Sequence, residues 1–308
     1  MEGAPAEDRT EPPRVEEFGR FTRRAGSRSA CVDIAGVAVE FDGLPEDLAE
    51  RMAVAYGPYL LPPGAGAARP LRIEVLAAPV DYFLPPGFRR GREVYRMPSV
   101  LENGIFRSVS YRLASWFDID RRVGQIALGT GDLDPAPRAL ENFLRSAVAW
   151  LALDQGGFFL HGASIVRGDR FYLFYGPSGA GKSTLAAMNR EGRVNSDDLT
   201  LVLRRPEGLV AAGGPFRGTY REGKPVTGTW PVAGFYRLRK DETTGVRPDD
   251  GGCFADLLGN LPFVVDQMPR HPEIIDRVRA LVDGVPLRYL HFRKDTNFWP
   301  AIDAGRSL

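Results

Sequence analysis

The stretch FYGPSGAGKST, residues 174–184, has glycines at fixed positions ahead of a lysine and a serine. Its pattern is a glycine, four variable residues, and then Gly181, Lys182 and Ser183. The apolar run RFYLFY before it predicts a strand, and the residues from Ser183 to about Glu191 are expected to form a helix. A strand, a glycine-rich loop and a helix in this order predict an α/β fold.

The residue types in this loop suit a phosphate group. Glycines allow backbone angles that turn successive N–H groups inward, which creates an anion-binding nest. A lysine supplies a charge for the β- and γ-phosphates, and a serine hydroxyl can ligate Mg²⁺. We therefore expect ATP, or another nucleoside triphosphate or phosphate donor, to bind with Mg²⁺ at Gly176, Pro177, Ser178, Gly179, Ala180, Gly181, Lys182, Ser183 and Thr184.

A pair of acidic residues follows the expected helix. Asp197 and Asp198 arrive after one helix and one tight turn, so their strand should lie close to the strand of the loop. A metal-bound triphosphate needs a carboxylate near Mg²⁺, and a second carboxylate can accept the proton of an attacking hydroxyl. The two residues could divide these roles, together with Ser183 as a metal ligand. The alternative is a solvated turn.

His161 lies on the strand before the loop strand, across a short hairpin whose turn is Arg167-Gly168-Asp169. A hairpin partner can bring an imidazole alongside the carboxylates and tune their protonation. The alternative is an ordinary packing residue.

Composition excludes several classes of protein. The formal net charge is +1 and 44% of residues are hydrophobic, so nothing favours bulk nucleic-acid binding, which needs a basic face. No apolar run approaches the length of a membrane span, and no signal-peptide core begins the chain. The two cysteines, Cys31 and Cys253, fit reduced thiols, and a cytoplasmic protein is expected.

The chain is expected to divide into three parts. Residues 1–28 are rich in Pro, Gly and charge, and are predicted to be a disordered tail. Residues 29–133 predict a small α+β module with strands that include 93–97. Residues 134–308 predict the nucleotide-binding domain, which begins with a helix capped by Asp134 and Pro135.

Three motifs together resemble one family. LHGASIV (160–166), the phosphate loop and NSDDLTLV (195–202) look like the kinase core of HPr kinase/phosphorylase and its relatives. GPFRG (214–218) and the closing LRYLHFRKDTNFW extend the resemblance more loosely. The chain more closely resembles the HPr-kinase-related proteins of bacterial peptide-tailoring and secretion cassettes, because it lacks the downstream signature of true HPr kinases and has Thr184 where many of them carry an acidic residue.

The resemblance implies a PEP carboxykinase-like fold with a mixed sheet. It implies that one of Asp197 and Asp198 is the general base and that the other attends the metal. His161 matches the family histidine beside the catalytic carboxylate. Arg217 is a candidate contact for phosphate or acceptor. It further implies a peptide or small-protein acceptor and a homo-oligomer.

The expected function is a kinase that transfers the γ-phosphoryl of ATP to a hydroxyl, in particular a serine. Two alternatives remain open. One is a nucleotide-gated regulator or peptide carrier without transfer, and the other is a phosphohydrolase or phosphorylase that uses the same site. A GTPase is disfavoured because no guanine-reading motif follows the loop, and a transport ATPase because its other signatures are not evident.

Overall fold

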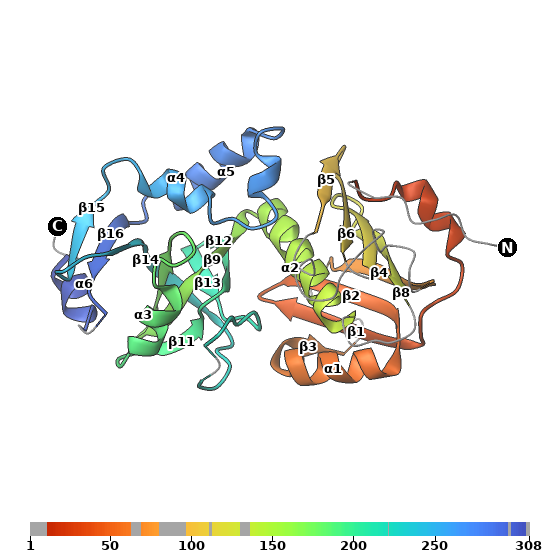
Figure 1. The fold of residues 1–308 in the computed structure, drawn as a ribbon, viewed down its shortest axis with the longest axis horizontal. Helices are drawn as coiled ribbons and strands as arrows, with labels where there is room; N and C mark the ends of the chain where they lie inside the picture. Colours follow the sequence, from red (N-terminus) through yellow and green to blue (C-terminus); the bar gives the residue numbers. More distant parts are fainter. Residues whose placement is uncertain are drawn as a thin grey trace. The chain divides into compact units, whose positions relative to one another are not determined.

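The structure is a computed structural model that describes residues 11–62, 69–79, 97–110, 113–129, 136–220, 222–294 and 297–305. The chain divides into two compact units, residues 1–148 and 149–308. Both contain a large sheet of mixed parallel and antiparallel strands with helices, which confirms the α/β class (Figure 1). Within the described residues, no helix is long and apolar enough to cross a membrane.

The first unit is built on a sheet with the strand order β3-β1-β2-β4-β8-β7-β6-β5. Its strands are β1 (Arg28–Ile34), β2 (Val37–Leu44), β3 (Leu60–Leu61), β4 (Leu71–Ala78), β5 (Ser99–Glu102), β6 (Ile105–Ser110), β7 (Leu113–Asp118) and β8 (Val123–Gly129). The helical elements are η1 (Val15–Arg20), α1 (Glu46–Tyr56), η2 (Gly57–Tyr59) and α2 (Ala136–Asp154). The predicted cap of α2 and most of the strand predicted at 93–97 lie outside the described residues.

The predicted disordered tail is wrong for residues 11–28. Phe18 in η1 is 1% exposed, and its ring meets Phe21 edge-on at 6.4 Å between centroids. The backbone then pairs with β4, since the Ala77 amide donates to the Arg23 carbonyl and the Ala25 amide to the Val75 carbonyl. Apolar burial and sheet pairing therefore hold this segment despite its charged composition.

The predicted domain boundary also differs from the observed one. The whole helix from residue 134 was expected in the second domain, but the units divide inside α2, between Val148 and Ala149. The reason is Phe143, which is fully buried and packs edge-on against Phe41 and Phe117 of the first sheet at 6.0 Å. The first part of α2 thus completes the core of the first unit.

The second unit has the strand order β10-β9-β12-β13-β14-β16-β15, with β11 on β9. Its strands are β9 (Gly157–Arg167), β10 (Arg170–Tyr175), β11 (Arg193–Ser196), β12 (Leu199–Arg205), β13 (Gly208–Ala212), β14 (Thr229–Lys240), β15 (Gly245–Pro248) and β16 (Leu287–Phe292). Its helices are α3 (Lys182–Met188), α4 (Cys253–Leu258), η3 (Val265–Gln267), α5 (Glu273–Val282) and α6 (Trp299–Gly305).

Two long strands of this sheet change pairing partners along their length. β9 pairs with β12 through residues 157–161 and with β10 through residues 162–167. β14 pairs first with β13 and then, in parallel, with both β10 and β16. The carboxyl ends of the parallel strands β10, β14 and β16 therefore meet at one edge of the sheet, which is where α/β folds bind ligands.

An aromatic cluster packs behind that edge. Trp299 of α6 is fully buried, and its ring meets Tyr172 and Phe174 of β10 edge-on at 4.9 and 6.2 Å. Leu185 and Ala186 of α3 belong to the same buried cluster. Each such side chain contributes about 1.5–3 kcal/mol when it is fully buried. The helix after the phosphate loop is therefore fixed to the strand before it.

Candidate functional site

The phosphate loop connects β10 to α3, as the sequence predicted. Gly179 and Gly181 have φ angles of 79° and 105°, which residues with a Cβ rarely adopt. A Cβ on Gly181 would also lie 2.6 Å from Cζ of Phe292, at the end of β16. The loop is thus held both by its own backbone angles and by the ring beneath it.

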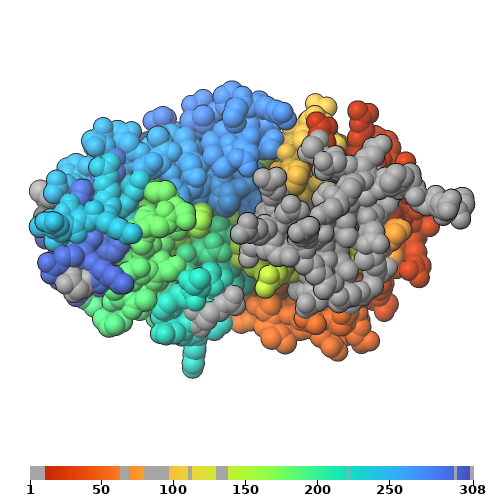
Figure 2. Space-filling view, viewed as in Figure 1, coloured from red at the N-terminus to blue at the C-terminus, as the bar shows by residue number. Residues whose placement is uncertain are grey.

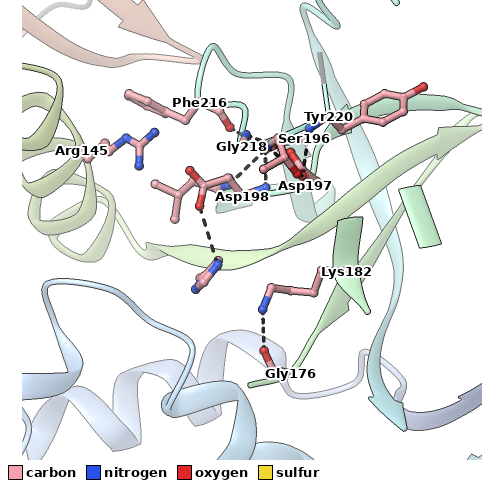
Figure 3. Close-up of polar contacts among 12 residues, drawn as sticks. Arg145, Gly176, Lys182, Ser196, Asp197, Asp198, Phe216, Gly218 and Tyr220 are labelled. Atoms are coloured by element: carbon pink, nitrogen blue, oxygen red, sulfur yellow. Dashed lines mark hydrogen bonds and ion pairs between the residues drawn. The ribbon is translucent and has the colours of Figure 1, made fainter. Parts of the chain in front are cut away.

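Lys182 begins α3 and is 9% exposed. Its ammonium donates a hydrogen bond to the carbonyl of Gly176 at 2.8 Å (Figure 3). A second, longer bond goes to the carbonyl of Pro177 at 3.3 Å. Burial lowers the pKa of Lys182, and nearby Asp198 opposes the shift. The charge therefore sits at the base of the loop, among its carbonyls.

Asp197 is 4% exposed, and its carboxylate accepts several hydrogen bonds from one loop. Oδ1 accepts from the Gly218 amide at 2.9 Å. Oδ2 accepts from the Thr219 amide at 3.1 Å, the Thr219 hydroxyl at 2.9 Å and the Tyr220 amide at 3.1 Å (Figure 3). The Ser183 hydroxyl also lies near this carboxylate and lowers its pKa.

These bonds decide the protonation of Asp197. Burial raises the pKa of Asp197, but the hydrogen bonds from Ser183 and from the loop at Tyr220, Thr219 and Gly218 outweigh it and hold the pKa below 3.8. The carboxylate is consequently ionised at neutral pH. It links the phosphate loop, through Ser183, to the segment at 218–220.

That segment belongs to the loop of residues 213–228, which joins β13 to β14 and is called the strap below. Ser196 donates to the Phe216 carbonyl at 2.5 Å, and Asn195 accepts from the Gly214 amide at 3.1 Å. A Cβ on Gly218 would lie 2.9 Å from Oδ1 of Asp197, so only glycine fits there. The teal surface that includes the strap adjoins the green surface of the phosphate loop and α3 (Figure 2).

Asp198 faces His161, as the hairpin argument predicted. Nε2 of His161 lies 3.7 Å from Oδ1 of Asp198. The side chains are 44% and 20% exposed, so both reach solvent while Asp197 does not. The backbone fixes this arrangement, because the Gly162 amide donates to the Asp198 carbonyl at 2.8 Å.

All these groups surround one cavity of about 390 Å³. The phosphate loop, the acidic pair and His161 meet there. The cavity is lined by His161, Ser178, Gly179, Gly181, Lys182, Ser183, Thr184, Asp197, Asp198, Gly218, Thr219 and Lys240.

Three predicted loop residues lie behind the cavity wall. Gly176 and Pro177 supply the carbonyls that hold Lys182, and Ala180 packs against the buried aromatic cluster. These three residues shape the loop, and their neighbours in the chain line the cavity.

The structure does not bring Arg217 into the cavity. Its guanidinium donates to the backbone carbonyls of Glu222, Gly223 and Lys224 at 3.3, 3.1 and 2.9 Å, which closes a turn within the strap. The GPFRG motif contributes Gly218 to the site instead.

Sequence reasoning did not find Thr219 and Lys240 among the residues that line the cavity. Thr219 follows the GPFRG motif, which was quoted only for its arginine. Lys240 is the last residue of β14, and the parallel pairing of β14 with β10 brings it to the edge that carries the phosphate loop. A signal for Thr219 was therefore present in the sequence, whereas Lys240 needed the strand order.

Comparisons with known proteins add no family. No protein-family model matches the chain, and no curated protein matches it. The site must therefore be interpreted from its own geometry. Among the residues that the structure describes, no three His, Cys, Asp or Glu side chains gather closely enough to hold a metal ion by themselves.

Proposed function

We propose that this protein is a nucleotide- and Mg²⁺-dependent kinase that phosphorylates a hydroxyl group, in particular a serine of a peptide or small protein. One observation carries the proposal. Lys182 and Ser183 of the phosphate loop line the same 390 Å³ cavity as the two carboxylates and His161. Phosphoryl transfer needs this combination of a phosphate cradle, a cation and a carboxylate that faces the acceptor.

The metal fits Ser183 better than Asp197. The Asp197 carboxylate has about four lone-pair positions, and the strap already directs four donors at them. Asp197 would thus orient the Ser183 hydroxyl toward Mg²⁺, which usually keeps few protein ligands and several phosphate or water oxygens. Bound there, the ion would neutralise negative charge on the transferring phosphoryl group.

Asp198 is the better general base for an external acceptor. Its carboxylate is 20% exposed, lines the cavity and faces His161 at 3.7 Å. A base must come within hydrogen-bond reach of the hydroxyl whose proton it takes, and only an accessible carboxylate can do so. His161 would orient this carboxylate. The sequence left open which aspartate is the base. The geometry favours Asp198 as the base and Asp197 as the residue that orients the metal ligand Ser183.

The proposal includes the family resemblance. The parallel strands β10, β14 and β16 that end at the cavity, and the hairpin that carries His161, support a PEP carboxykinase-like core. The resemblance to HPr-kinase-related proteins of peptide-tailoring cassettes then suggests a peptide as the acceptor and ATP as the donor.

The test is phosphoryl transfer to serine-containing peptides, followed by mass spectrometry with Mg²⁺-ATP. Asp198→Asn should slow transfer by at least about 100-fold, the usual contribution of a general base, and leave ATP affinity unchanged. Asp169→Asn, in the exposed turn between β9 and β10, is the matched control and should behave as wild type.

Other outcomes choose between the alternatives. Equal rates in the Asp198→Asn variant and the wild type would show that Asp198 is not the base. Tight ATP binding without transfer to any peptide would favour a nucleotide-gated binding protein. Phosphate release from a phosphopeptide without nucleotide would favour a phosphohydrolase.

A further inference from the structure

The strap places its own hydroxyl in the cavity. Thr219 is exposed and lines the cavity together with Lys182 and Ser183. Its hydroxyl donates to Oδ2 of Asp197 at 2.9 Å, which is within the range over which a general base takes a proton. No part of the proposed kinase reaction on an external acceptor uses this hydroxyl.

Thr219 also lies close to the expected position of the donor phosphates. The Thr219 hydroxyl donates to the Asp197 carboxylate, and the Ser183 hydroxyl lies near enough to the same carboxylate to lower its pKa. Both residues also line the same cavity. Since a serine at the Ser183 position contacts the metal bound to the β- and γ-phosphates, the Thr219 hydroxyl faces the reacting end of the donor.

We propose that Thr219 is an internal phosphoryl acceptor, which the protein phosphorylates in cis. The inference rests on the proposed kinase function. Oγ of Thr219 forms a bond to the γ-phosphorus, and the bond from that phosphorus to the β–γ bridging oxygen breaks. The nucleoside diphosphate leaves with the bridging oxygen, and the hydroxyl proton passes to Oδ2 of Asp197.

The geometry favours reaction within one molecule. The backbone amides of Gly218, Thr219 and Tyr220 all donate to Asp197, so the strap holds the hydroxyl in place. Such positioning replaces a bimolecular encounter with an intramolecular one. The loose transition state of phosphoryl transfer requires little basicity from the proton acceptor, so an ionised, hydrogen-bonded aspartate suffices.

The product also has a consequence for the site. A phosphothreonine at residue 219 carries nearly two negative charges at neutral pH. It would lie beside Asp197 and in the cavity that takes the donor phosphates. Phosphorylation of Thr219 is therefore expected to oppose the next round of nucleotide binding.

The experiment is a time course with the full-length protein, first treated with a phosphatase and then freed of it. The protein is incubated with Mg²⁺-ATP, and intact mass and peptide mapping follow each sample. We expect one phosphoryl group on Thr219, with a rate constant that does not change when the protein is diluted. Thr219→Val and Lys182→Ala should lose it, and Thr219→Ser should gain it on the new serine.

Thr243→Val is the matched control. The Thr243 amide and hydroxyl also donate to one aspartate, Oδ1 of Asp241 at 3.2 and 3.4 Å, but Thr243 does not line the cavity. This variant should be phosphorylated on Thr219 as the wild type is.

Three results overturn the inference in distinguishable ways. If a serine peptide is phosphorylated in a Lys182-dependent manner while Thr219 stays unmodified, the kinase proposal stands and the internal acceptor is wrong. If no ATP binds and no group is modified, both proposals fail. A rate that rises in proportion to protein concentration would refute reaction in cis.

Discussion

Asp197→Asn should loosen the strap without unfolding the second unit. The carboxylate holds the strap through the amides of Gly218, Thr219 and Tyr220 and through the Thr219 hydroxyl. Asparagine keeps one oxygen and replaces the other with an NH₂ group, which cannot accept the remaining donors. The replacement therefore breaks at least one hydrogen bond to a buried charged group.

The magnitude follows from the strength of such a bond. A hydrogen bond to a charged group contributes about 1.5–3 kcal/mol. Since about 1.4 kcal/mol corresponds to a factor of ten, local opening should become about 10- to 100-fold more frequent. Hydrogen exchange reports such local opening, so the amides of residues 218–220 should exchange faster by that factor.

The assay is hydrogen–deuterium exchange with fragmentation that isolates residues 218–220. Asp241→Asn is the control, because that aspartate holds the Thr243 amide and should leave 218–220 unchanged. Unaltered exchange at 218–220 in the Asp197→Asn variant would refute the reasoning. So would an equal acceleration in β9 and β12, which would indicate global destabilisation.

Acid should reproduce the effect in the wild type. The pKa of Asp197 is lowered in the folded protein, so its stabilising contribution is complete above the unfolded value, near 3.8. The contribution is lost as the pH falls through the lowered pKa. The difference in protection between wild type and Asp197→Asn should thus be constant at neutral pH and shrink only in strong acid.

Three further changes have expected outcomes. Gly181→Ala should abolish nucleotide binding in a calorimetric titration, because the new Cβ meets Phe292 at 2.6 Å and the φ of 105° is strained; a Kd like that of wild type would contradict this. Arg167→Ala should lower the free energy of unfolding by about 1–3 kcal/mol, since the Arg167 guanidinium is bidentate to Asp303 and lies over the buried ring of Trp299. Urea titrations provide the test, and Arg167→Lys should not restore the wild-type stability, because lysine cannot form the bidentate pair. Burial lowers the pKa of Lys182, so its charge, and with it the nucleotide affinity, should be lost below pH 10.5, the usual pKa of a lysine. An affinity that stays constant up to pH 10.5 would argue against a charged Lys182 as the phosphate contact.

Sequence patterns predicted the parts of the site that are close together in the chain. The phosphate loop and Asp197-Asp198 follow one another across a single helix, and the hairpin that carries His161 directly precedes them. Local rules for strands, turns and glycine loops were sufficient there.

The strap could not be predicted in the same way. Its role depends on the amides of residues 218–220, and backbone donors leave no trace in side-chain chemistry. Arg217 drew attention as a cation, yet its guanidinium binds carbonyls of its own loop. Folding of the strap onto Asp197 follows from the pairing of β13 with β14, which is a long-range property of the sheet.

Composition was misleading at the start of the first unit. Proline and charge at residues 11–28 hid Phe18, which is buried in an apolar cluster with Ala78, Val109, Ala114 and Ala127.

The most direct test of the central claim is a calorimetric titration of Mg²⁺-ATP into the wild-type protein and into Lys182→Ala. We predict saturable binding to the wild type, with the stoichiometry of a single site, and its loss in the variant. The roles proposed for the phosphate loop and the cavity, and transfer to either proposed acceptor, require that binding. Absence of binding to the wild type, or equal binding to both proteins, would contradict the proposed function.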